Sequence, residues 1–226
     1  MYWTQQIMLS IRNNFIFIHI RKCAGKSMSA ALDKYSDESL FQTSEEYEQN
    51  RAALESKILG SFTTDQHTPL RAYRKNLHPN FYKNCFKFCV VRNPWERMIS
   101  YYHWKKQKQS GMPNDEFNES AFKLLVQNQP GMETYLVDRK MYLNKALGVL
   151  INPFDMSPID YYLKYENLEE DFAKLITKLG IHHEGANLNR IGKTHRKHYR
   201  HYYSEEMAEF VAKRFKNEIE YFGYKF

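Results

Sequence analysis

The stretch NFIFIHIRKCAGKSMS, residues 14–29, decides how the rest of the sequence is interpreted. It opens with aromatic and β-branched residues, which are typical of a strand buried on both faces. Small and cationic residues follow, and the last residues suit the first turns of a helix. Unpaired N–H groups at a helix N-terminus attract anions. Because Gly25 permits close approach of the backbone and Lys22 and Lys26 add charge, this turn predicts a site for a phosphate or sulfate group.

A second stretch repeats this order of elements. Residues 86–91 (FKFCVV) form another buried-strand pattern, and Arg92 stands where that strand ends, which is a common ligand position in open parallel sheets. Asn93-Pro94 suits the cap and the first residue of a helix that we expect to run to about residue 108. Ser100 lies two turns into that helix. The second stretch therefore predicts further ligands for the same anion.

Together the two stretches resemble the sulfotransferase superfamily, in the branch that includes Golgi carbohydrate sulfotransferases and their bacterial relatives. In that family, a strand ending in PK-x-x-G-T-(S/T) binds the 5′-phosphosulfate of the donor 3′-phosphoadenosine 5′-phosphosulfate (PAPS). A later strand ending in R-(D/N)-P-x-x-R-x-x-S-x-Y binds the 3′-phosphate. Residues 21–27 and 92–101 stand at these places, and further similarity reaches the C-terminal residues.

The resemblance implies an α/β fold with a central parallel sheet flanked by helices, a three-layer sandwich like that of P-loop nucleotide kinases. Residues 1–226 would form a single sulfotransferase domain. The enzyme would move a sulfuryl group from PAPS to an acceptor hydroxyl, on a carbohydrate or a small sugar-containing molecule, without a metal. The residues that we expect to contact PAPS are Lys22, Cys23, Ala24, Gly25, Lys26, Ser27, Arg92, Ser100, Lys193 and Arg196.

Two departures from the family motif fall in the first turn. Arg21 stands where the family has Pro, and Lys26 stands where it has Thr, so contacts with the donor differ there in detail. Lys22 also has an expected catalytic role, because it would neutralise the charge that grows on the bridging oxygen. We expect Arg97 to pair with an acidic side chain, and Glu166 to have a structural role.

His67 is the residue that we expect to act as the base. It follows a strand predicted at about 57–62, which would bring it to the sheet edge that carries both anion sites. By order along the chain, it also matches the base histidine of carbohydrate sulfotransferases. An imidazole titrates near neutral pH, which suits removal of a hydroxyl proton. The alternative interpretation is a capping or surface histidine near Pro69, and we expect His19 to be packed within the first strand.

Two other classes of function stay open from the sequence. Gly25-Lys26-Ser27 also resembles the end of a Walker A motif, as in kinases that use ATP and Mg²⁺. Ile20 stands where that motif needs its first Gly, however, and Asp65 is the one fair candidate to help hold Mg²⁺. The net charge of +7 and the basic stretch 193–200 would also suit a nucleic-acid-binding protein. Because no zinc-finger, homeodomain or RNP-type pattern is present, we expect no nucleic-acid partner.

Composition fits one globular domain, since 42% of the 226 residues are hydrophobic and 15% are aromatic. The three cysteines cannot all pair within the chain, and we interpret them as buried thiols in a reducing compartment. The sequence shows no signal peptide or membrane span, so we expect a cytoplasmic protein. The oligomeric state stays open. Besides the elements above, the pattern predicts a short strand at 161–165 and helices at about 26–35, 44–55, 69–77, 168–179 and 205–222. It predicts helices or mixed structure at 117–127 and 133–147.

Overall fold

The computed structural model describes residues 9–35, 56–59, 66–110, 117–136, 159–181, 188 and 196–226. Within these residues lies one four-stranded sheet with the strand order β1-β2-β3-β4. Strands β2 (Phe15–Ile18), β3 (Phe86–Val91) and β4 (Tyr161–Lys164) run parallel, as the sequence predicts. The short edge strand β1 (Leu9–Ser10) pairs antiparallel with β2 and was not predicted. The expected α/β class is therefore confirmed, with a mixed rather than purely parallel sheet.

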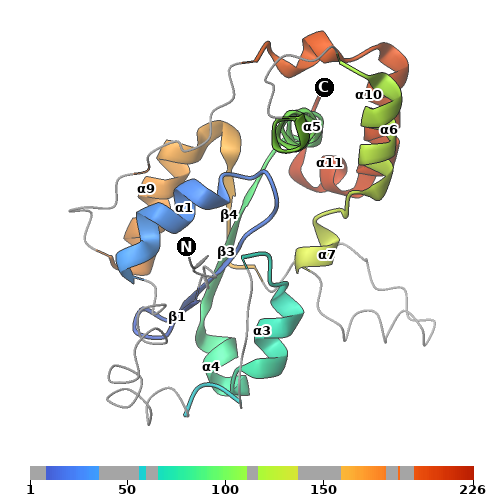
Figure 1. Cartoon of the computed structure of the whole chain (residues 1–226). Helices are drawn as coiled ribbons and strands as arrows, with labels where there is room; N and C mark the ends of the chain where they lie inside the picture. The colour runs from blue at the N-terminus through green and yellow to red at the C-terminus, as the bar shows by residue number, and fades with distance from the viewer. Residues whose placement is uncertain are drawn as a thin grey trace.

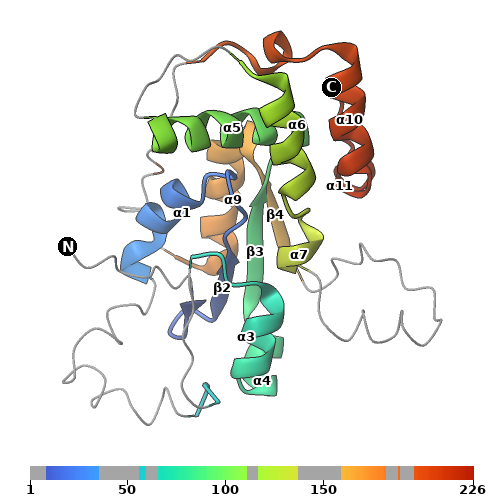
Figure 2. The ribbon, with the colours of Figure 1, turned by 45° about the vertical axis from the view of Figure 1, so that its right-hand side comes forward.

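Helices cover both faces of this sheet (Figures 1 and 2). Helices α1 (Gly25–Leu32) and α9 (Leu168–Leu179) lie on one side, and α3 (Leu70–Asn76) and α4 (Pro79–Asn84) lie on the other. Every residue of β2 is buried, which explains its unbroken apolar sequence. A 3₁₀ turn, Asp33–Tyr35, continues α1. This arrangement sets the carboxyl ends of β2 and β3 side by side.

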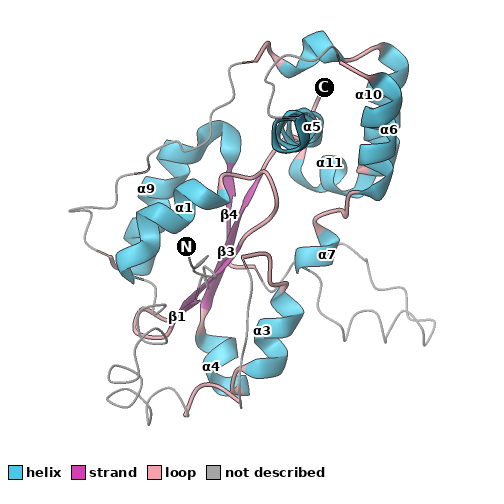
Figure 3. Cartoon of the chain, viewed as in Figure 1, coloured by secondary structure: helices cyan, strands magenta, loops and turns pink. Residues whose placement is uncertain are grey.

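A second group of helices gathers at the carboxyl end of the sheet (Figure 3). Helix α5 (Pro94–Ser110) follows β3 directly, and α6 (Glu119–Asn128), α10 (Glu205–Arg214) and α11 (Lys216–Phe222) pack beside it. Their shared core is apolar and includes Ile99, Phe122, Val211 and Phe215. The short elements α7 (Glu133–Leu136), Tyr165–Asn167 and Tyr199–Tyr202 connect these parts. None of the helices that the structure describes is long and apolar enough to cross a membrane.

A buried ion pair joins α5 to α11. Nη2 of Arg97 lies 2.7 Å from Oε2 and 3.0 Å from Oε1 of Glu218, and both side chains are almost fully buried. Oε1 of Glu218 also accepts a hydrogen bond of 2.6 Å from the backbone N–H of Met132. The expectation that Arg97 pairs with an acidic side chain is confirmed. This pair keeps the charges compensated in an interior where an unpaired charge would be costly.

Several predicted boundaries differ from the structure. The strand predicted at about 57–62 is wrong for its described residues, because only Ile58 forms an isolated antiparallel bridge, with Leu77, while β2 pairs directly with β3. The predicted helix at 205–222 is divided at Phe215, whose backbone leaves the helical region at φ −115° and ψ 29°. Helix α4 was not predicted. The helix predicted at about 44–55, and the part of the predicted helix 133–147 beyond Leu136, lie outside the described residues.

Candidate active site

The turn between β2 and α1 has an unusual backbone. Lys22 and Ala24 adopt left-handed conformations, with φ of 64° and 54°, although neither is glycine. Such residues cost about 1–3 kcal/mol each and cluster at ligand sites. The N–H of Met28 is bonded to the carbonyl of Ala24, so the N–H groups before it point out of the helix end. The turn therefore presents a row of backbone donors and the positive end of the α1 dipole to one place.

A cavity of about 550 Å³ lies in front of this turn. Its wall combines the turn and the start of α1 with residues 66–67, the end of β3, one side of α5 and the start of α9. The predicted site residues that line it are Lys22, Ala24, Gly25, Lys26, Ser27, His67, Arg92 and Ser100. Its cations are Arg21, Lys22, Lys26, Arg92 and Lys108, and no Asp or Glu among the described residues lines it. The cavity therefore suits a polyanionic ligand.

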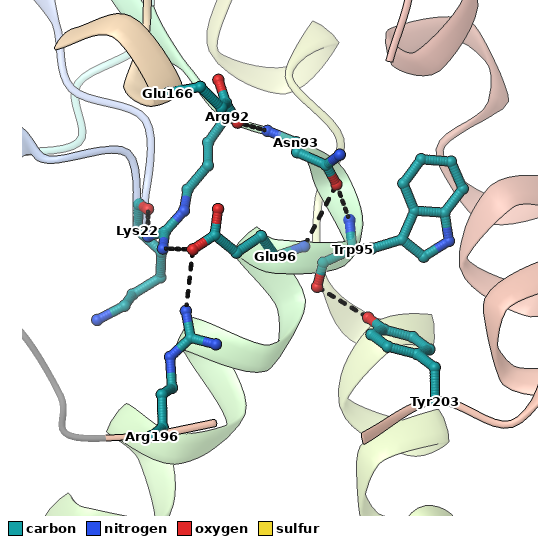
Figure 4. Close-up of polar contacts among 8 residues, drawn as sticks. All are labelled: Lys22, Arg92, Asn93, Trp95, Glu96, Glu166, Arg196 and Tyr203. Atoms are coloured by element: carbon teal, nitrogen blue, oxygen red, sulfur yellow. Dashed lines mark hydrogen bonds and ion pairs between the residues drawn. The ribbon is translucent and has the colours of Figure 1, made fainter. Parts of the chain in front are cut away.

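Arg92 ties the turn to α5, as Figure 4 shows. Its Nη1 donates a hydrogen bond of 2.9 Å to the carbonyl of Lys22, and its Nη2 bonds Oε1 of Glu96 at 2.8 Å. The guanidinium stacks 3.7 Å from the centroid of the Tyr165 ring. With 6% of its side chain exposed, Arg92 has little conformational freedom. It therefore braces the left-handed Lys22 backbone as well as lining the cavity.

Glu96 connects Arg92 to a second arginine (Figure 4). Nη2 of Arg196 lies 3.3 Å from Oε1 of Glu96, the oxygen that Arg92 also contacts. Burial, followed by repulsion from Arg92, lowers the pKa of Arg196, and Glu96 opposes this shift. Arg196 is not among the residues that line the cavity, and its ion pair with Glu96 connects it to Arg92. The other predicted cation of this segment, Lys193, lies outside the described residues.

Lys22 lies in the most positive part of the site. Burial, followed by repulsion from the neighbouring charges of Arg92, Lys26 and Arg196, lowers its pKa to about 8. Its Nζ lies 5.4 Å from the ring centroid of Trp104 on α5. An anion bound in the cavity would offset the repulsion that these neighbours exert on Lys22, and it would therefore stabilise the charged form of this lysine.

His67 lies in the cavity wall with a defined ring orientation. Its Nδ1 is 3.0 Å from the backbone carbonyl of His19, and a carbonyl oxygen can only accept a hydrogen bond. In the neutral ring, Nδ1 therefore carries the proton and Nε2 carries the lone pair. That is the tautomer in which Nε2 can accept a proton from a hydroxyl. The strand expected to lead to His67 does not form in its described residues, 57–59.

Cys23 does not line the cavity, in contrast to the other residues of the predicted turn. It is 1% exposed, and burial raises the pKa of its thiol to about 12. Cys85 and Cys89 are also buried free thiols, as expected. The side chain of Cys23 thus belongs to the core, and only its backbone can contribute to the turn.

Asn93 and Glu166 set the start of α5. Oδ1 of Asn93 accepts hydrogen bonds from the N–H groups of Trp95 at 3.0 Å and Glu96 at 3.4 Å, so Asn93 caps the helix as predicted. Oε1 of Glu166 accepts from the N–H of Asn93 at 2.8 Å (Figure 4). Glu166 therefore has a structural contact here, and it holds the strand end that carries Arg92.

Sequence reasoning missed several residues of the cavity wall. Tyr101, Trp104, Gln107 and Lys108 of α5 line it with Ser100. In a helix, residues four, seven and eight positions after Ser100 lie on nearly the same face as Ser100. The predicted helix therefore could have indicated these lining residues. Gln66, His19 and Tyr165 come from other elements, and no local pattern marks them.

Comparison with protein families identifies the family of this chain. Residues 5–225 match the sulfotransferase family. An uncharacterized protein of Archaeoglobus fulgidus is 27% identical over 118 residues, which cover 51% of this chain and 85% of that protein. Among solved structures, retinol dehydratase in complex with androsterone and the inactive cofactor PAP is similar with a TM-score of 0.38 and 14% identity, over 95% of this chain and 83% of that one.

Proposed function

The chain belongs to the sulfotransferase family and transfers a sulfuryl group from PAPS, and we propose that its acceptor is a carbohydrate hydroxyl deprotonated by His67. The observation that carries the proposal is the meeting of the α1 N-terminus, Lys22 and the Nδ1-protonated His67 in one cationic cavity. Membership of this family replaces the interpretation as an ATP- and Mg²⁺-dependent kinase. Asp65, on which that interpretation relied, lies outside the described residues.

The turn fits the phosphate end of PAPS. The N–H groups at the start of α1 suit the 5′-phosphosulfate, because they are preorganised and need no movement to receive an anion. Arg92 and Ser100, which line the same cavity from the end of β3 and from α5, suit the 3′-phosphate. A volume of about 550 Å³ is within the range of sites for nucleotide-sized ligands. The donor brings an activated sulfuryl group, and the residues of this chain bind and orient it.

Lys22 and His67 would have complementary roles in the transfer. His67 accepts the acceptor hydroxyl proton at Nε2, while Nδ1–H stays bonded to the carbonyl of His19 and stabilises the imidazolium that forms. The ammonium of Lys22 offsets negative charge that grows on the leaving oxygen. As a sulfur–oxygen bond forms to the acceptor, the bond to the phosphate oxygen breaks, and His67 keeps the proton. No described acidic side chain of the cavity opposes this flow of charge.

A carbohydrate acceptor is supported by the resemblance to carbohydrate sulfotransferases and by the chemistry of the α5 side. Tyr101 and Trp104 line the cavity with ring centroids 5.4 Å apart, and aromatic faces pack against sugar rings. Gln66 and Gln107 add amide groups that can bond sugar hydroxyls. This combination of aromatic faces and neutral polar groups suits a sugar better than a purely apolar acceptor.

Thermal unfolding with ligands tests the donor site. 3′-Phosphoadenosine 5′-phosphate (PAP) should raise the unfolding midpoint of the wild-type protein, whereas ATP with Mg²⁺ should have a much smaller effect, because a ligand that binds the folded state stabilises it by mass action. Arg92→Ala should remove the PAP effect, and Arg71→Ala, at an exposed arginine on α3, should retain it. A shift with ATP and Mg²⁺ alone would contradict the proposal.

A transfer assay with labelled PAPS tests the acceptor and the base. We expect label to move to neutral or acidic oligosaccharides and not to steroids or simple phenols. His67→Asn should lower kcat by a factor of about 10²–10⁴, the usual contribution of a general base, and leave PAP binding nearly unchanged. Activity that survives His67→Asn, or label found only on apolar alcohols, would overturn the respective half of the proposal.

A further inference from the structure

His19 lies between the phosphate-binding turn and His67. It follows β2 directly, lines the cavity and is 7% exposed. Its ring centroid is 4.6 Å from that of His67, with an interplanar angle of 58°. Behind it lies Phe17 of β2, whose ring is nearly parallel to the imidazole at 6.0 Å. The His19 ring is therefore fixed by the sheet on one side and faces the proposed base on the other.

The same ring explains why a glycine begins α1. A Cβ built on Gly25 would lie 1.6 Å from Nε2, 1.8 Å from Cδ2 and 2.3 Å from Cε1 of His19. Gly25 is not among the glycines with positive φ, so its backbone could carry a side chain. The imidazole of His19, and not the backbone conformation, excludes a side chain at the point where the helix N-terminus faces the cavity.

His19 also contacts His67 through its backbone. Its carbonyl oxygen lies 3.0 Å from Nδ1 of His67 and sets the tautomer of that ring. One residue thus touches both halves of the site, with its ring against Gly25 and with its ring and carbonyl against His67. The contact between residues 19 and 67 joins the turn to a segment 48 positions away.

The His19 ring is held in its neutral form. Burial, followed by the charges of His67, Arg21, Lys26 and Lys22, lowers its pKa to about 3. A neutral ring does not repel the proton that His67 takes up, and it does not compete for that proton. Its Nδ1 is buried without a hydrogen-bond partner among the described residues, a cost that an apolar side chain of similar size would avoid. Packing stability alone therefore does not account for an imidazole here.

We propose that His19 is a positioning residue, whose ring holds the donor-binding turn and the base His67 at a fixed separation. The inference rests on the proposed roles of the turn and of His67. It assigns no proton transfer to His19 itself. It predicts that substitutions at Gly25 and His19 have coupled effects on PAP binding, because the His19 ring fills the space that a side chain at position 25 would need.

A double-mutant cycle with PAP as the probe tests the first half of this inference. Gly25→Ala should weaken PAP binding by about tenfold or more, because the new methyl group displaces the His19 ring and the turn. His19→Ala removes the obstacle, so the double variant should bind PAP within about threefold of His19→Ala alone. Losses that simply multiply would overturn the inference. If Gly25→Ala does not fold, recovery of folding in the double variant supports the same coupling, and its failure to fold contradicts it.

The second half needs a readout at His67 that does not depend on the acceptor. Long-range ¹H–¹⁵N spectra of protein labelled at histidine distinguish Nδ1–H from Nε2–H rings. His19→Ala keeps the backbone carbonyl that bonds Nδ1 of His67 but removes the ring that packs against His67. Without that ring His67 can turn away from the carbonyl, so we expect one Nδ1–H form for His67 in the wild type and a mixture of both forms in His19→Ala. An unchanged single tautomer in His19→Ala would overturn this half. Wild-type protein that does not bind PAP would overturn the proposed function and this inference together, whereas additive losses in variants that bind PAP would overturn the inference alone.

Discussion

Lys22 shows how a single residue can be unfavourable for the fold and yet suit a site for an anion. Its backbone is left-handed at φ 64°, and three cationic side chains surround its ammonium. Neither property stabilises the protein in the absence of ligand. Both become useful when an anion arrives, because the strained turn directs N–H groups at the ligand and the ligand relieves the repulsion.

Lys22→Met should therefore stabilise the ligand-free protein and remove its response to PAP. The folded-state pKa of Lys22 is about 8, below its ordinary value of 10.5, so its charge disfavours folding at pH 7. Between about pH 8 and 10.5 the unfolded chain binds more protons at this residue than the folded one, so wild-type stability gains with rising pH there. The advantage of Lys22→Met should shrink over the same window. Denaturant unfolding at pH 7 and pH 10 measures this, with Lys83→Met on α4 as the matched exposed control.

Arg92→Lys should lose function although it keeps the charge. A lysine ammonium cannot bond the carbonyl of Lys22 and Glu96 together while it stacks on Tyr165. We expect PAP affinity to fall by about tenfold or more. Arg71→Lys is the control, because Arg71 makes one exposed hydrogen bond, to the carbonyl of Thr134. Near-normal PAP titration of Arg92→Lys would show that charge alone matters at this position.

The sequence predicted Lys22, Arg92 and Ser100 because they belong to two contiguous motifs, each a strand end followed by a helix. It did not predict the role of His19. That role depends on contacts with Gly25 and His67, and the second of these crosses 48 positions without a local signal. His67 was placed in the site by its order in the chain, while the strand proposed to lead there does not form in its described residues, 57–59. Cys23 was included with its neighbours, but its side chain turns into the core.

At the scale of elements, the hydrophobic pattern predicted those strands and helices whose bounds are set by the burial of their own apolar residues. Strand β3 and helix α9 have the predicted bounds, since an unbroken apolar run and a strong 3.6-residue pattern leave little choice. Strand β1 has two residues and pairs only with β2 at the sheet edge. Two residues are too few to show an alternating or apolar sequence pattern. The break between α10 and α11 at Phe215 is set by packing: Phe215 is 2% exposed and lies beneath the guanidinium of Arg97.

The Arg97–Glu218 pair should hold α5 and α11 together strongly enough to measure. Arg97→Met leaves Glu218 buried without its cation, and removing one partner of such a pair costs about 3–5 kcal/mol. Burial raises the pKa of Glu218, and the loss of Arg97 would raise it further. We expect the double variant Arg97→Met with Glu218→Leu to be more stable than Arg97→Met alone in guanidinium unfolding. A double variant at least as unstable as the sum of the single variants would contradict a charge-compensating role.

For the whole molecule, the position of charge matters more than its total. The chain carries a net charge of +7, yet the cations that line the cavity gather at the carboxyl end of the sheet, where no described acidic side chain lines the wall. Glu96 lies behind this wall and compensates Arg92 and Arg196. Arg92 and Arg196, near the turn, are thus paired with an acidic side chain, whereas other cations lie at the rim of the cavity. Arg21 and Lys108 line the cavity and are exposed, so they are placed to attract an anion over a distance.

Association with PAP should therefore depend on salt through the rim of the cavity. Charges separated by more than about 10 Å are largely screened at 0.1 M salt, and a focused field can raise association rates by roughly 10–10³-fold. We expect the stopped-flow association rate constant to fall steeply from low to high NaCl for the wild type, and less steeply for Arg21→Gln with Lys108→Gln. The control is Lys83→Gln with Lys216→Gln, which removes the same charge from exposed sites on α4 and α11. Equal salt slopes for the two double variants would show that net charge, and not its focus at the cavity, governs the approach of the donor.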